Sequence, residues 1–175
     1  MRPAPAFKRA SFKRDVPGST IDPAGKWTLH TDGACEPNPG SGGIGFVLTA
    51  PDGVVVYEAS RGIGQATNNI AEYRALIEGL QVAVTVEIPA LVVYSDSQLM
   101  VEQMKGRWRV KHPGIKPLHA EATGLAAKFR AIAFQWIPRE QNEAADALAV
   151  LGVAAPPAEL QAMDDHLLAI GREGS

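Results

Sequence analysis

Four acidic residues stand at the boundaries of expected strands and helices, where side chains can converge. Asp32 follows an apolar, strand-like run, and Asp96 ends the run LVVYSD. Glu72 lies in the first turn of an expected helix, and Asp146 lies early in NEAADALAVLG. Each acid has an ordinary structural explanation. Asp32 would stabilise a turn, and Asp96 would cap the following helix. Glu72 would form a capping box with Asn69, and Asp146 would lie on a solvated helix face.

Taken together, the four acids also fit a metal site. Carboxylates that are crowded at one place repel one another unless a cation neutralises them. Oxygen ligands, without cysteine or histidine at ligand spacing, favour Mg²⁺ or Mn²⁺ over zinc. Four carboxylates can hold two such ions, which is the arrangement that activates water in phosphodiester cleavage. The spacing alone leaves both the structural and the hydrolytic interpretation open.

The glycine-rich segment after Asp32 contains a literal G-x-G-x-x-G at Gly40, Gly42 and Gly45. A dinucleotide-binding loop must open a helix, whose N-terminus receives the pyrophosphate. Here the strand-like run IGFVLTA follows, so we reject that interpretation. We expect instead a wide turn in which glycine allows a ligand's backbone to approach closely.

The elements that position these residues follow from hydrophobic periodicity and turn signals. We expect three strands joined by short turns, then a helix over Ile70–Val84, where apolar residues recur at helical spacing. The remaining expected elements are a strand at LVVYSD, a helix from Ser97 to about Lys105, a helix from about Leu118 to Phe129, a strand at AIAFQWIP and a helix over Asn142–Val153. This order predicts an α/β domain with a five-stranded mixed sheet flanked by helices, over residues 26–153.

Composition places this domain between two short extensions. The chain has 175 residues, 46% of them apolar and 21% charged, which is typical of a folded domain, and it lacks the apolar run that a membrane span needs. Residues 1–25 form a basic tail with Phe-Lys-Arg twice, which we expect to be disordered; binding to nucleic acid is the alternative. Residues 154–175 include an expected helix over 158–170. The single cysteine, Cys35, suits a reducing, cytoplasmic location.

Four segments in order resemble the motifs of type 1 ribonuclease H: TDGACEPNPGSGGIG, TNNIAEYRALIEGL, YSDSQLMVEQMKG and WIPREQNEAADALA. The resemblance covers about Trp27 to Gly152 and implies an RNase H-like fold. It also implies that Asp32, Glu72, Asp96 and Asp146 are catalytic ligands of two Mg²⁺ ions, with Mn²⁺ able to substitute. The implied activity is hydrolysis of the RNA strand of RNA–DNA hybrids, leaving 5′-phosphate products.

The same resemblance implies a set of substrate contacts. Amide and backbone groups suit a 2′-hydroxyl, which both donates and accepts hydrogen bonds and distinguishes RNA from DNA. The residues carried over are Gly33, Asn38, Thr67, Asn68, Asn69 and Gln98, with Thr67 expected near a phosphate of the DNA strand. For the segment TNN, a turn with a helix cap is the structural alternative, and the two roles are compatible.

The chain departs from the best-known bacterial pattern in two places. The segment IPREQNEAAD lacks the histidine found before the last acid in that pattern, and Arg139 is our candidate replacement, as a phosphate contact rather than a neutral base. The long basic helix-loop is also missing. In its place stands KGRWRVKHPGIKP, whose candidate nucleic-acid contacts are Lys105, Arg107, Trp108, Arg109 and Lys111. This compact form resembles the archaeal-type branch.

That branch raises activity on double-stranded RNA as an alternative. A second alternative is a module that binds hybrid without cutting it, although pure binding does not require all four acids. We expect RNA–DNA hybrid as the partner, no membrane partner, and a monomeric protein.

Overall fold

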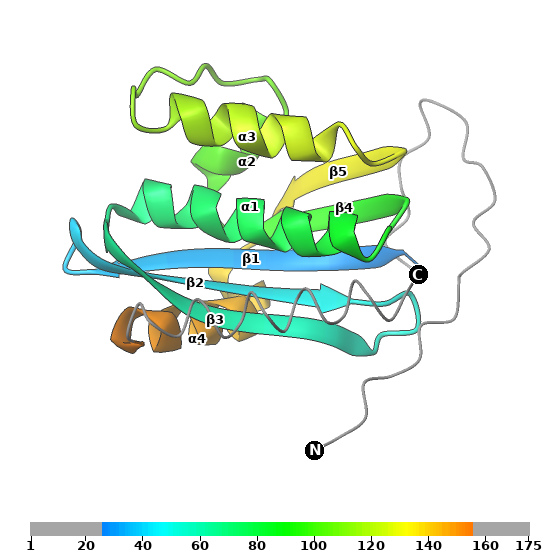
Figure 1. Ribbon diagram of the computed structural model, residues 1–175, viewed down its shortest axis with the longest axis horizontal. Helices are drawn as coiled ribbons and strands as arrows, with labels where there is room; N and C mark the ends of the chain where they lie inside the picture. The colour runs from blue at the N-terminus through cyan, green and yellow to red at the C-terminus, as the bar shows by residue number, and fades with distance from the viewer. Residues whose placement is uncertain (1–25, 156–175) are drawn as a thin grey trace.

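The computed structural model describes residues 26–155, so the basic tail and the expected helix over 158–170 lie outside the described residues. A single five-stranded sheet organises the chain, in the order β3-β2-β1-β4-β5 (Figure 1). The strands are β1 (Trp27–Glu36), β2 (Gly40–Thr49), β3 (Val55–Ala66), β4 (Ala90–Ser95) and β5 (Ala131–Trp136). β1, β2 and β3 pair antiparallel, while β4 and β5 run parallel to β1. The predicted five-stranded mixed sheet is confirmed.

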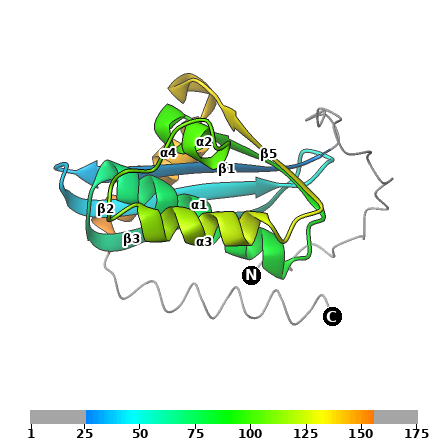
Figure 2. The same cartoon turned by 90° about the horizontal axis from the view of Figure 1, so that it is seen from above.

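Helices cover both faces of this sheet. They are α1 (Asn68–Thr85), α2 (Gln98–Met104), α3 (Lys116–Ala126) and α4 (Glu143–Ala154), with a short 3₁₀ turn η1 (Arg139–Gln141) before α4. α1 packs on β1 and β2, and α3 lies beside α1, whereas α4 lies on the opposite face against β1, β2 and β3 (Figures 1 and 2). Among residues 26–155, no helix combines the length and the apolar character that a bilayer span requires.

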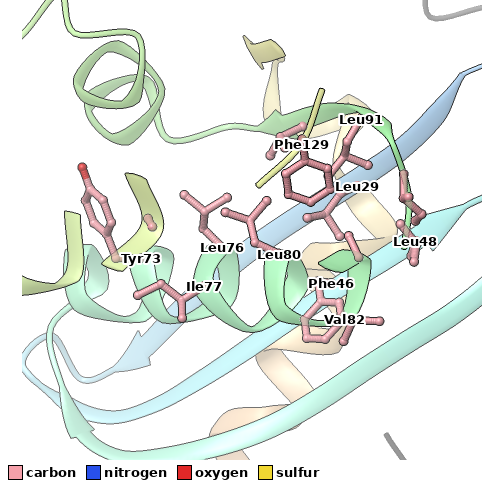
Figure 3. Packing of buried hydrophobic residues seen from close by; sticks show 14 of the residues in the cluster. Leu29, Phe46, Leu48, Tyr73, Leu76, Ile77, Leu80, Val82, Leu91 and Phe129 are labelled. Atoms are coloured by element: carbon pink, nitrogen blue, oxygen red, sulfur yellow. The ribbon is translucent and has the colours of Figure 1, made fainter. Parts of the chain in front are cut away.

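The main core lies between α1 and the sheet. Leu29 and Leu48 are fully buried from the strand side, and Leu76 and Leu80 from α1 (Figure 3). Leu76 and Leu80 are four residues apart, so they share one face of the helix. Fully burying a leucine side chain stabilises the fold by about 1.5–3 kcal/mol, so this layer fixes α1 firmly against the central strand.

Two expectations about the Asp32 segment were wrong. Asp32 does not end its strand, because β1 continues to Glu36 and pairs with β2 as far as Ser41. The glycines do not form a wide turn either, because Gly40, Gly42 and Gly45 lie within β2 itself. Only Pro37, Asn38 and Pro39 separate the two strands. The run was misjudged because glycine is usually depleted in strands, whereas here a helix backbone approaches the sheet closely.

Candidate active site

Three carboxylates meet at the middle of the sheet. Asp32 comes from the interior of β1, Glu72 from the first turns of α1, and Asp96 from the residue after β4. One carboxylate oxygen of each lies within 4.8 Å of the others. β1 and β4 run parallel, and His30 pairs with Tyr94. Continuing this register by two residues places Asp96 beside Asp32. The sheet therefore brings three of the four predicted acids into one cluster.

Burial and mutual repulsion disfavour the charged forms of these three acids. Desolvation, then the charge of Asp96, raises the pKa of Asp32 to about 7. Desolvation and the neighbouring Asp32 raise the pKa of Glu72 well above its ordinary value. The pKa of Asp96 is also raised, chiefly by burial. Carboxylates in such a setting need either protons or a cation.

The cluster fits a divalent cation. Asp32 is only 4% exposed, and Oε2 of Glu72 is buried without a hydrogen-bond partner within residues 26–155. A buried polar atom without a partner is unusual and calls for an explanation, of which an ion is one. Because the donors are all carboxylate oxygens, they suit a hard cation such as Mg²⁺ or Mn²⁺.

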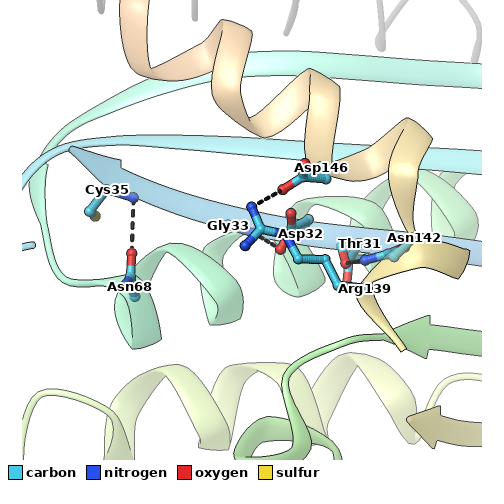
Figure 4. A network of polar contacts seen from close by, with 8 residues as sticks. All are labelled: Thr31, Asp32, Gly33, Cys35, Asn68, Arg139, Asn142 and Asp146. Atoms are coloured by element: carbon cyan, nitrogen blue, oxygen red, sulfur yellow. Dashed lines mark hydrogen bonds and ion pairs between the residues drawn. The ribbon is translucent and has the colours of Figure 1, made fainter. Parts of the chain in front are cut away.

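Asp146 lies at the border of this cluster, not among the three closest acids. Its charge contributes to the raised pKa values of Asp32 and Asp96. Its Oδ1 accepts a hydrogen bond from Nη2 of Arg139 at 3.3 Å (Figure 4). Asp146 thus lies near the other acids and pairs with the guanidinium of Arg139, while its side chain stays 29% exposed on α4. Arg139 is mostly exposed, with 74% of its side chain accessible.

Glycines allow the helices to reach these positions. A Cβ on Gly33 would lie 2.3 Å from the backbone N of Glu72, so only glycine lets α1 approach β1 this closely. On the other face, a Cβ on Gly45 would lie 2.4 Å from the carbonyl oxygen of Ala145. Gly45 pairs with Asp32 in the β1–β2 ladder, so this contact brings α4 and Asp146 to the cluster.

Two of the structural explanations for the acids were wrong. Thr67, not Asn69, caps α1, because its hydroxyl accepts a hydrogen bond from the N–H of Ile70. Ser97, not Asp96, caps α2 in the same way. Because hydroxyl caps serve both helices, Glu72 and Asp96 are left available to the cluster.

One residue of the site was missed by sequence reasoning. Asn142 is 1% exposed, and its Nδ2 donates to the carbonyl oxygen of Thr31 at 2.9 Å (Figure 4). This bond ties the start of α4 to the residue before Asp32. An asparagine just before a helix looks like an ordinary cap in the sequence, yet its side chain makes no cap hydrogen bond here. No sequence signal distinguishes the two roles.

The predicted substrate contacts of the first turn and α1 form a second group. Oδ1 of Asn38 accepts a hydrogen bond from the backbone N–H of Asn68 at 3.2 Å. Figure 4 shows the second bond, in which Oδ1 of Asn68 accepts from the backbone N–H of Cys35 at 3.0 Å. These bonds join the β1–β2 turn to the N-terminus of α1. Asn69 and Gln98 are exposed beside the cluster-bearing elements. The structure thus places them where a ligand can reach them, and their contacts with substrate stay predictions.

The predicted basic residues lie apart from the carboxylates, after α2. All five of Lys105, Arg107, Trp108, Arg109 and Lys111 are exposed, and Trp108 is 45% accessible. Nε2 of Gln103 donates to the carbonyl oxygen of Arg109, and Oε1 of Gln103 accepts from the hydroxyl of Tyr73. Because Tyr73 follows Glu72 in α1, this network connects the basic loop to the helix that carries the cluster.

Comparisons with known proteins identify the family. Residues 30–152 match the family described as Reverse transcriptase-like. Bifunctional protein Rv2228c of Mycobacterium tuberculosis is 47% identical over 125 residues, which cover 71% of this chain but only 34% of that protein. The chain thus spans about a third of the length of this relative.

Solved structures resemble the whole described domain. RNase H1 of the archaeon Halobacterium salinarum is 37% identical with a TM-score of 0.72, over 74% of this chain and 98% of that one. LC11-RNase H1, isolated from compost by a metagenomic approach and solved in complex with RNA/DNA hybrid, is 36% identical with a TM-score of 0.69, over 74% and 97% of the two chains. From the fold, the acidic cluster and these similarities, the chain belongs to the type 1 ribonuclease H family.

Proposed function

We propose that this protein is an endoribonuclease that hydrolyses the RNA strand of RNA–DNA hybrids. The observation that carries the proposal is the oxygen-only cluster of the buried Asp32 with the half-buried Glu72 and Asp96, in which one oxygen of Glu72 has no hydrogen-bond partner among the described residues. The similarity to a ribonuclease crystallised with a hybrid supports the substrate class. We also propose a monomeric, cytoplasmic protein.

Asp32, Glu72 and Asp96, with Asp146 at the border, would hold two Mg²⁺ or Mn²⁺ ions. When bound, such ions activate a water molecule and stabilise the departing 3′ oxygen of the cut strand. The raised pKa of Asp32 agrees with this role, because a cation would replace the protons that the crowded acids otherwise need.

The remaining groups would position the substrate. The exposed Asn69 and Gln98 offer amides that can both donate to and accept from a 2′-hydroxyl. Asn38 and Asn68 hold the β1–β2 turn against α1 and so fix the rim of the site. Arg139 would contact a phosphate, because its guanidinium is exposed and pairs with Asp146 alone among the residues that the structure describes.

The direct test is cleavage of an end-labelled RNA–DNA hybrid in Mg²⁺ by wild type and by Asp32→Asn. We expect wild type to cut the RNA strand only and to leave 5′-phosphate ends, and we expect Asp32→Asn to lose at least about 1,000-fold in rate. Double-stranded RNA and double-stranded DNA serve as parallel substrates, and the RNA duplex decides whether the specificity is broader. If wild type binds hybrid but cuts it in neither Mg²⁺ nor Mn²⁺, the protein is a binding module and the proposal is wrong.

A further inference from the structure

The two edges of the sheet differ in how they are protected. β3, at one edge, carries the charged Glu58 and Arg61, and its pairing with β2 shifts register at two places. Charges and bulges of this kind discourage pairing with another chain. β5, at the other edge, has the sequence AIAFQW, which contains no charge, no proline and no glycine, and its pairing with β4 has no register shift (Figure 2).

The free side of β5 presents backbone groups in a regular row. The N–H of Ala131 donates to the carbonyl oxygen of Pro89, and the N–H of Ile137 donates to that of Ser95. The backbone N–H and C=O groups of the odd-numbered residues of β5 therefore point toward β4. Because the direction of backbone groups alternates along a strand, Ile132, Phe134 and Trp136 direct their N–H and C=O groups away from the sheet. An extended peptide can pair with such a row.

A shallow groove of about 600 Å³ lies beside this edge, between β5, the end of α2 and the second half of α3. Its apolar lining includes Met104 from α2, Ala126 from α3, and Ile132 and Phe134 from β5. The side chains of Ile132 and Phe134 are only partly buried, although they pack against the main core. Alternate side chains of an added strand would find an apolar surface here.

The rim of the groove is cationic. Lys105 and Arg107 line it, and no acidic side chain is among its described lining residues. Arg107 is 67% exposed and makes one long ion pair, 3.7 Å, with Glu102, so most of its donors remain accessible. Lys128 and Arg130 are exposed just before β5 begins. Within the described chain, the groove therefore complements a negatively charged, apolar ligand.

We infer that this groove binds an extended segment of a partner protein, added as a strand to the edge of β5, whose groove-facing side chains, every second residue, are aliphatic and acidic in turn. Backbone pairing would supply affinity, the aliphatic side chains would enter the groove, and the acids would meet Lys105 and Arg107. A nucleic acid fits less well, because Phe134 is the one aromatic side chain among the described lining residues and because bases cannot pair with the backbone row of β5 as a strand does. The inference goes beyond the proposed cleavage activity and does not depend on it.

The experiment measures binding of a fluorescein-labelled octapeptide to the full chain by fluorescence anisotropy. The peptide has Val and Asp in turn at every second position, which share one face of a strand, with Thr between them. We expect micromolar binding, at least tenfold weaker for a peptide N-methylated along one edge, which cannot pair as a strand, and for the same peptide with Lys in place of Asp. Thr123→Trp, which fills the groove from α3, should weaken binding at least tenfold, whereas Thr123→Ala should not. The double change Lys105→Glu with Arg107→Glu should weaken it similarly, with Lys111→Glu, from the same basic segment but outside the groove lining, as the matched control.

Retained far-ultraviolet circular dichroism and unchanged hybrid cleavage by Thr123→Trp would establish that the variant is folded. Absence of binding at 1 mM peptide, or binding that Thr123→Trp leaves unchanged, would overturn the inference. Two further outcomes would also overturn it. If Thr123→Trp weakens hybrid binding instead, the groove belongs to the nucleic-acid surface. If wild type forms a concentration-dependent dimer that Thr123→Trp abolishes, the occupant is a second copy.

Discussion

The carboxylate cluster and the basic loop after α2 are both proposed to act on the same substrate, but the cluster is packed inside the fold and the loop is exposed. Asp32 is 4% exposed and lies in the central strand, where a neighbouring glycine packs directly on α1. The basic loop exposes every one of its candidate contacts and is tied to the core through Gln103 and Tyr73. Chemistry requires fixed positions of its ligands, whereas long-range attraction of a polyanion tolerates mobile charges. Substitutions at the cluster should therefore lower the cleavage rate or the stability, whereas substitutions in the loop should mainly weaken substrate binding.

Gly33→Ala, beside the cluster, should reduce both stability and cleavage and so separate the two regions most. A methyl group there would lie 2.3 Å from the backbone of Ala71 and Glu72, so α1 must move and take Glu72 with it. We expect a loss of about 1–3 kcal/mol in the free energy of unfolding and at least about a 100-fold loss in cleavage rate. The measurements are denaturant unfolding and single-turnover cleavage. Gly124→Ala in α3 is the matched control.

A Cβ at Gly124 meets nothing within 4 Å, so that substitution should stabilise the protein by up to about 1 kcal/mol through helix propensity. Cleavage should stay unchanged. If Gly33→Ala retained full activity, the close contact of β1 with α1 would not be what positions Glu72.

A second difference between the regions should appear in the pH dependence of stability. The pKa of Asp32 is raised by burial from 3.8 to about 7, and that of Glu72 is also raised. A raised pKa means that the folded state binds more protons than the unfolded state, so stability of the metal-free protein falls as pH rises from about 4 to about 7. Asp32→Asn should flatten this decline, because the amide carries no charge at either pH.

Mg²⁺ should reverse the same decline, and thermal unfolding at pH 5 and pH 8 with and without the ion measures both effects. Binding to the folded state raises its stability, and deprotonated ligands bind more tightly, so the increase in Tm should be larger at pH 8. Lys111→Glu in the basic loop should leave this pattern unchanged. An equal Tm increase in Asp32→Asn would place the ion elsewhere.

The order of elements could be predicted from the sequence because it follows from local patterns, whereas the cluster was predicted from the resemblance of four motifs to a known family. Helical spacing predicted α1 over Ile70–Val84, within the observed Asn68–Thr85. The motif resemblance named Asp32, Glu72 and Asp96 before their oxygens were found within 4.8 Å. Where local pattern and tertiary contact agree, prediction from sequence works.

The parts that could not be predicted depend on contacts between distant segments. The glycines of β2 indicated a turn by composition, but they lie in a strand because α4, about a hundred residues later, packs on Gly43 and Gly45. Asn142 was predicted only as the first residue of a helix, but its side chain crosses to Thr31. The position of Asp146 beside Arg139 depends on η1, a short turn with no periodic signal.

A smaller effect is expected in the basic loop itself. Lys111→Glu reverses the charge of an exposed side chain, so the free energy of unfolding should change by less than about 0.5 kcal/mol. If the loop contacts hybrid, KM should rise several-fold with kcat nearly unchanged, and the dependence of binding on salt should weaken. Steady-state cleavage at two salt concentrations measures both. A fall in kcat at constant KM would mean that the loop takes part in the chemistry.

The smallest effect should come from Arg139→Ala, because Arg139 is an exposed residue at the border of the carboxylate cluster. The ion pair with Asp146 is 3.3 Å long, but 74% of the Arg139 side chain is exposed, so its loss should cost less than about 1 kcal/mol of stability. The charge of Arg139 nevertheless lowers the pKa of Asp96, partly opposing the effect of burial. Without this charge the pKa of Asp96 should rise, and the acidic limb of the cleavage pH profile should move to higher pH.

Arg139→Lys, which keeps the charge, should return the acidic limb to its wild-type position. A phosphate contact that needs the planar guanidinium would instead leave a several-fold defect in KM. The two readouts separate an electrostatic role at the cluster from a contact with the substrate, and an unchanged profile together with an unchanged KM would exclude Arg139 from the site.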